Sequence, residues 1–219
     1  KWYACQYSTG LIYTVTTDTG EITLVGGGGN NLDALAYDKL TNTMWGAGDM
    51  NLFSIDIETG AQTVVGPFGG GSYYMIGMAF SSQGVLYGWD LSDYLWTIDT
   101  STGAATQVGP LGINLNYAGQ DGDFDMVNDI LYLAVTISPS CGSFLYECDR
   151  DTGECTLVDG FQNCAVVYTF FIPYNYSNKY PIVKFSWKPT LPEPEGTIFF
   201  NASSCYDPDG YITLYEWDW

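Results

Sequence analysis

A hairpin-like segment recurs four times along the first three quarters of the chain. Each copy has alternating apolar residues, a polar turn that ends in Thr-Gly, and a second alternating stretch. The copies are LIYTVTTDTGEITLVG (11–26), NLFSIDIETGAQTVVG (51–66), YLWTIDTSTGAATQVG (94–109) and FLYECDRDTGECTLVD (144–159). Their Thr-Gly pairs begin at residues 19, 59, 102 and 152, so the spacings are 40, 43 and 50. Apolar alternation on both sides of a glycine-ended turn predicts a β-hairpin in each copy.

A second hairpin recurs between these copies. Residues 32–49 and 75–90 each have an apolar strand, a polar turn, and a strand with an aromatic residue before glycine, and residues 123–135 resemble them. Four strands in a period of 40 to 50 residues are typical of a β-propeller blade. WYAC at 2–5 matches the second strand of a blade, and CAVVYTFFI at 164–172 matches a first strand. We therefore predict 16 strands in four blades, with the last strand completing the first blade and removing its open edge.

These repeats resemble secreted β-propeller proteins whose blades carry an LYxIDxxTGxxTxVG hairpin. The resemblance covers residues 1 to about 173 and implies the fold, not an activity. An alternative stays open, in which the four blades are part of a larger ring that another chain completes.

Composition and charge exclude several classes of protein. The chain has 219 residues, 46% of them apolar, and no apolar run approaches the roughly 20 residues of a membrane-spanning helix. Its net charge of −19 repels phosphate groups, so we expect neither nucleic-acid binding nor membrane insertion. The absence of histidine excludes Ser-His-Asp and Cys-His catalysis and histidine-ligated metals. We expect little or no helix, because Gly, Tyr, Trp and Thr are abundant.

Six cysteines suggest disulfides. None of them has the Cys-x-x-Cys spacing of metal or redox sites. Cys148 and Cys155 flank a predicted turn, so we expect a bridge between them, worth roughly 2.5 kcal/mol in the chain-entropy model. Cys5 and Cys164 would lie on neighbouring strands of the shared blade, so we expect a second bridge there. The sequence does not give the pairing of Cys141 and Cys205.

Two glycosylation triplets agree with an oxidising compartment. Asn175 and Asn201 each begin an Asn-x-Ser triplet. Together with the expected disulfides, they predict a secreted, glycosylated protein at the cell surface or outside the cell. The chain begins at Lys1 with no signal peptide, as expected for a processed mature form.

The composition changes after Pro173. We expect a propeller domain at 1–173, a linker at 174–180 and a third region at 181–219. Pro181, the strand TIFFNASSC (197–205), the turn Asp207-Pro208-Asp209-Gly210, Tyr215 and Trp217-Asp218 resemble the first half of a PKD domain, an immunoglobulin-like β-sandwich named from polycystic kidney disease protein. That family continues with further strands, whereas Trp219 is the last residue here. The region is then a fragment, a cleaved product, or a half-sandwich completed by strands of a neighbouring molecule.

Two acidic clusters are candidate calcium sites, and calcium is the one ion we consider. Asp121, Asp123 and Asp125 alternate in a short segment and could offer hard oxygen ligands. The alternative is ordinary turn and strand-edge polarity. Asp207 and Asp209 resemble the acidic turn that binds calcium in some PKD domains. Their alternative is a turn whose aspartates accept hydrogen bonds from backbone N–H groups.

Enzymatic roles have little support in the sequence. Carboxylate pairs such as Asp90 and Glu147 could hydrolyse glycosides without histidine. Sialidase-type propellers need an arginine cluster, however, and Arg150 is the only arginine. Trp45, Trp89 and Trp96 could stack on sugars, but their periodic positions favour packing between blades.

We therefore expect a non-enzymatic extracellular structural glycoprotein with no certain cofactor. It would self-assemble into a surface fibre, surface layer or adhesive appendage through strand complementation, with Trp187, Trp217 and Trp219 at the interface. The PKD resemblance also implies contact with proteins or glycans. The alternative is a carbohydrate- or cell-wall-binding module of a larger secreted protein or hydrolase.

Overall fold

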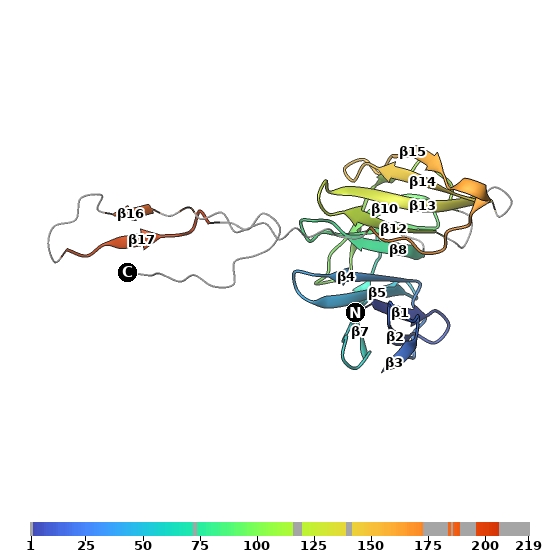
Figure 1. The fold of residues 1–219 in the computed structure, drawn as a ribbon, viewed down its shortest axis with the longest axis horizontal. Helices are drawn as coiled ribbons and strands as arrows, with labels where there is room; N and C mark the ends of the chain where they lie inside the picture. Colours follow the sequence, from blue (N-terminus) through green and yellow to red (C-terminus); the bar gives the residue numbers. More distant parts are fainter. Residues whose placement is uncertain are drawn as a thin grey trace. The chain divides into compact units, whose positions relative to one another are not determined.

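The computed structural model describes residues 2–71, 74–115, 120–138, 142–172, 184, 186–188 and 196–205. The chain divides into two compact units, Lys1–Pro173 and Tyr174–Trp219, each of which is described by itself. The fold is all-β, and the first unit has four antiparallel sheets in a propeller-like ring (Figure 1). Among the described residues the only helix is η1, three residues of 3-10 helix at Gln162–Cys164. No described helix has the length and apolar character needed to cross a bilayer.

The sheets of the first unit follow the order of the chain. Sheet 1 consists of β1 (Trp2–Gln6), β2 (Leu11–Val15) and β3 (Ile22–Gly27). Sheet 2 consists of β4 (Ala34–Asp38), β5 (Thr43–Gly48), β6 (Asn51–Ile55) and β7 (Gln62–Pro67). Sheet 3 consists of β8 (Met75–Phe80), β9 (Leu86–Asp90), β10 (Tyr94–Ile98) and β11 (Ala105–Pro110). Sheet 4 consists of β12 (Gln120–Asp125), β13 (Ile130–Ser138), β14 (Gly142–Cys148) and β15 (Cys155–Gly160).

The four Thr-Gly hairpins predicted from the repeat are all present. They are β2–β3, β6–β7, β10–β11 and β14–β15, and each has a register shift at the same place in the repeat. Asp56, Asp99 and Asp149 begin three of the turns and accept backbone N–H groups two or three residues later. These side-chain hydrogen bonds satisfy backbone N–H groups of the turn that have no partner in the hairpin ladder.

Apolar side chains between neighbouring sheets form the core. β8 lies between β4 and β12, so the first strands of sheets 2, 3 and 4 are neighbours (Figure 1). Trp89 and Trp96 are fully buried, at 0% and 2% exposure. Trp96 belongs to the cluster shared with sheet 2, and Trp89 to the cluster shared with sheet 4. Both are therefore packing residues, as their periodic positions predicted, and cannot stack on a sugar.

The predicted sixteenth strand is not formed. Sheet 1 has three strands, and residues 165–172, which we call the closing segment, belong to no sheet. Asn163 and Cys164 have φ of 59° and 53°, outside the extended range that a strand requires. The expected closure by strand exchange is thus replaced by a different contact, which involves side chains of β12.

The described part of the second unit contains one short ladder. β16 (Ser186–Lys188) and β17 (Phe199–Asn201) are antiparallel, and Trp187 lies opposite Phe200. Every residue of both strands is exposed. The immunoglobulin-like sandwich expected here lies largely outside the described residues.

Candidate functional site

Pairs of glycines join neighbouring sheets of the first unit. Gly109, at the end of β11, lies against Thr152 and Gly153 of the next sheet's turn. A Cβ on Gly109 would overlap the Thr152 carbonyl oxygen, and one on Gly153 would overlap the Gly109 backbone. We call this contact a glycine junction. It explains physically why the repeat has glycine at both places, because any side chain would separate the two backbones.

The same glycine junction occurs at all three joints between consecutive sheets. Gly26 meets Thr59 and Gly60, and Gly66 meets Thr102 and Gly103. Backbone hydrogen bonds accompany two of the junctions, from Ala105 N–H to the Phe68 carbonyl and from Cys155 N–H to the Leu111 carbonyl. At the first joint the side chain of Gln62 bonds to Asn30 instead. One repeated contact therefore sets the spacing of the four sheets.

The closing segment is held by two carboxylates of β12. Asp121 accepts hydrogen bonds from the Thr169 hydroxyl at 3.1 Å and from Phe170 N–H at 3.0 Å. Asp123 accepts one from Ile172 N–H at 3.1 Å. The rings of Phe171 and Trp2 meet edge to face, with centroids 4.9 Å apart. The segment thus links sheet 4 to β1 without forming a ladder.

Burial changes the acid–base properties of this region. It raises the pKa of Asp121 above the usual carboxyl value, although hydrogen bonds from Phe170, Gly122 and Thr169 act in the opposite direction. Burial also lowers the pKa of Lys39 to about 8, while the charge of Asp123 acts to raise it. Both side chains respond mainly to desolvation.

The candidate calcium residues have other roles in the first unit. Asp121 and Asp123 bind the closing segment, while Asp125 accepts N–H groups of Val127 and Asn128 in its own turn. Among the described residues, no group of three or more acidic or cysteine side chains is placed to hold a metal ion. The hydrogen bonds of these three aspartates match the alternative of turn and strand-edge polarity, and calcium binding here stays a prediction. Asp207 and Asp209 lie outside the described residues.

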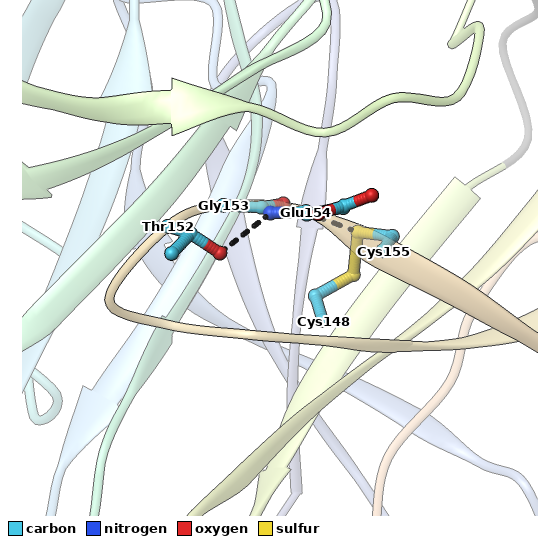
Figure 2. The surroundings of a disulfide bond; sticks show 5 residues. All are labelled: Cys148, Thr152, Gly153, Glu154 and Cys155. Atoms are coloured by element: carbon cyan, nitrogen blue, oxygen red, sulfur yellow. Dashed lines mark hydrogen bonds between the residues drawn. A yellow bond between two sulfur atoms is a disulfide. The ribbon is translucent and has the colours of Figure 1, made fainter.

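The disulfide between Cys148 and Cys155 is confirmed. The two residues lie directly opposite each other on β14 and β15, with Cα atoms 4.0 Å apart (Figure 2). The turn between them is held by the Thr152 hydroxyl, which accepts the N–H of Glu154 at 3.4 Å (Figure 2). A disulfide is consistent with an extracellular location.

The predicted bridge between Cys5 and Cys164 is not formed, and both thiols are free. Cys5 is half-buried, and its Sγ lies 3.9 Å from the Leu32 carbonyl oxygen. Cys164 is exposed and packs against Gly142 of sheet 4, because the strand that should have carried it to β1 is absent. Cys205 is also free, and Cys141 lies outside the described residues.

The expected interface and glycosylation residues are only partly described. Trp187 is 45% exposed on β16. Asn201 is exposed at the end of β17, and its side-chain oxygen accepts the N–H of Ser203 at 2.9 Å. Asn175, Trp217 and Trp219 lie outside the described residues. Sequence reasoning did not single out Phe199, which is 70% exposed beside Trp187's strand.

The acids considered for hydrolysis lie at different places. Asp90 is fully buried and accepts N–H groups of Ser92 and Tyr94 in its own turn. Glu147 lines a cavity of about 370 Å³ on sheet 4, together with Arg150, which forms an ion pair with Asp129. This arrangement gives Asp90 a structural role in its turn.

Comparison with known proteins defines the fold. No protein-family model matches the chain, and no curated protein matches it. A structural genomics protein of unknown function from Bacteroides thetaiotaomicron is 19% identical, with a TM-score of 0.56 over 71% of this chain and 40% of that one. The hydrazine synthase of Kuenenia stuttgartiensis is 12% identical, with a TM-score of 0.51 over 72% and 46%. A chain of a nidogen/laminin complex is 12% identical, with a TM-score of 0.56 over 76% and 63%.

These matches and the four sheets define the class as a β-propeller-like protein. The chain spans between 40% and 63% of the solved structures described above. At this level of identity the likeness shows the fold alone.

Proposed function

We propose that this chain is a non-enzymatic extracellular structural glycoprotein. It is a subunit of a surface fibre, surface layer or adhesive appendage, and β-strand complementation between subunits assembles it. The observation that carries the proposal is the exposure of apolar side chains on β17 and β16. Phe199 is 70% exposed, Trp187 45% and Phe200 37%.

Two strands by themselves, with such exposed side chains, are marginal in water and gain stability from further strands. Exposed strand edges also present backbone groups that can pair with a strand of another chain. The PKD resemblance and the Asn201 triplet support the same proposal, since they favour an extracellular module. The disulfide of sheet 4 agrees with that compartment.

Light scattering and negative-stain microscopy of the full chain test the proposal. We expect oligomers or filaments from the purified protein. Phe199→Ser should reduce their amount severalfold, because it removes the most exposed aromatic side chain of the ladder. Tyr168→Ser is the matched control, since Tyr168 is also 70% exposed but belongs to the first unit.

A monomeric protein that shows no dependence on Phe199 would refute assembly through this ladder. Binding of the monomer to a glycan array would then favour the carbohydrate- or cell-wall-binding alternative.

A further inference from the structure

The fourth sheet lacks the glycine that ends the other three hairpins. Gly26, Gly66 and Gly109 lie opposite Ile12, Leu52 and Leu95 in their hairpins. Asp159 lies opposite Leu145 in the same register. It therefore occupies the glycine position of the repeat and has a Cβ where the other three sheets have none next to a neighbouring Thr-Gly turn.

The Thr-Gly turn of the first sheet lacks the neighbouring sheet against which the other three Thr-Gly turns pack. Gly60, Gly103 and Gly153 are buried against the preceding sheet, whereas no atom lies within 4 Å of a Cβ on Gly20. Ile22 is 61% exposed, whereas the equivalent Ala105 is 8% exposed and bonds to sheet 2. No such bond joins the backbones of Ile22 and Phe161, both of which the structure describes.

The strand of sheet 1 that leads into this turn is uncovered as well. Phe53, Trp96 and Tyr146 are buried in clusters shared with the preceding sheet, and so are Ile55, Ile98 and Cys148. Their equivalents on β2, Tyr13 and Val15, are only half-buried.

Sheet 4 is uncovered on its outward side. Val158 is 51% exposed, whereas Val25, Val65 and Val108 at the same position are half-buried. In Figure 1, β3 and β15 lie at opposite ends of the first unit. The joint between sheets 4 and 1 therefore differs from the other three.

We propose that Tyr13, Val15, Gly20 and Ile22 form a docking surface for a further propeller blade whose last strand ends in Val-Gly. The glycine junction occurs three times within the chain, at Gly26, Gly66 and Gly109. These three glycines therefore show what the last strand of the partner blade must look like. The partner must have a glycine at the position that contacts the turn of Thr19 and Gly20. Sheet 4 of a second copy cannot fill this role, because Asp159 obstructs the contact.

The negative charge of Asp159 also opposes docking of sheet 4 onto the Gly20 turn of an identical chain. Asp18 and Glu21 lie close to Gly20 in the first turn, so a further carboxylate would be repelled. Asp159 thus blocks both ring closure through sheet 4 and head-to-tail addition of identical chains.

Complementary variants of the full chain test the proposal. All carry Phe199→Ser, so that assembly through the second unit does not interfere. The first chain has no other change and keeps the docking surface. The second carries Asp159→Gly, which creates a Val-Gly end, and Gly20→Asn, which blocks its own turn while tolerating positive φ.

Mixing equal amounts should double the weight-average mass in sedimentation equilibrium, as a one-to-one complex forms. The control replaces Asp159→Gly with Asp159→Asn, which removes the charge but keeps a side chain. Its mixture with the first chain should have the weight-average mass of a single chain. Circular dichroism of each variant verifies folding. If the folded glycine variant leaves the mass unchanged, or the asparagine control binds equally well, the proposal is overturned.

Discussion

Gly60 and Gly20 have the same φ of 71°, but only Gly60 packs against a neighbouring sheet. A Cβ on Gly60 would overlap the backbone of Gly26 and Gly27. Substitutions at the two positions therefore separate the cost of backbone strain from the cost of placing a side chain in the glycine junction.

We expect Gly20→Ala to lower the free energy of unfolding by about 1 kcal/mol, because an L-residue at positive φ is strained. Gly60→Ala should cost roughly 3 kcal/mol, since overpacking is added to the same strain. Urea unfolding of both variants measures the difference. Equal losses would mean that the junction does not contribute to stability.

The hairpins could be predicted from sequence because their determinants are local. The Thr-Gly turn and the flanking alternation fix each hairpin within about 16 residues, and the Cys148–Cys155 bridge follows from the same register. The closing segment could not be predicted in this way. Its hydrogen bonds join Phe170 to Asp121, 49 residues away, and nothing in a local pattern pairs a backbone amide with a distant carboxylate.

Asp121 should make stability depend on pH. Burial raises the pKa of Asp121, so the folded protein holds this proton at pH values where the unfolded chain has lost it. Stability should therefore fall as pH rises from the usual carboxyl pKa to the raised one. Unfolding at a series of pH values should show this slope in the wild type and a weaker one in Asp121→Asn.

Asp149→Asn is the control for that titration. Hydrogen bonds from Asp151 and Thr152 lower the pKa of Asp149, so its contribution has the opposite sign and is lost as pH falls. A wild-type slope that Asp121→Asn leaves unchanged would show that Asp121 is not the group responsible.

Lys39 should titrate separately from the other four lysines. Burial lowers its pKa to about 8, and Asp123 opposes the shift. Nuclear magnetic resonance of the lysine side chains should give one midpoint near that value. Asp123→Asn should lower the midpoint further, because it removes the stabilising negative charge. A midpoint that rises or does not move in the variant would contradict this electrostatic account.

The two free thiols that the structure describes in the first unit, Cys5 and Cys164, should differ in reactivity. Burial raises the pKa of Cys5, which reduces its thiolate, while Cys164 is exposed. Native alkylation followed by mass spectrometry should label Cys164 at least about tenfold faster than Cys5. Cys148 and Cys155 should be labelled only after reduction. Equal labelling of Cys5 and Cys164 would place Cys5 outside the half-buried environment described above.

The candidate site illustrates the limit of composition as a guide. Asp121, Asp123 and Asp125 resemble metal ligands because they are close in sequence, whereas the structure shows their carboxylates accepting hydrogen bonds from backbone amides and polar side chains. The departure at Asp159 is visible in the repeat as LVD in place of a Val-Gly ending. Its meaning depends on the three-dimensional fact that the other glycines touch the next sheet's turn.

Amide hydrogen exchange of the purified chain tests the central claim most directly, namely that glycine junctions close three joints of the ring and leave the fourth open. Ala105 and Cys155 donate their N–H groups to the preceding sheet, whereas the equivalent N–H of Ile22 has no such acceptor. We predict slow exchange at Ala105 and Cys155 and exchange at Ile22 faster by at least about a hundredfold. Equal protection at all three amides would contradict the account.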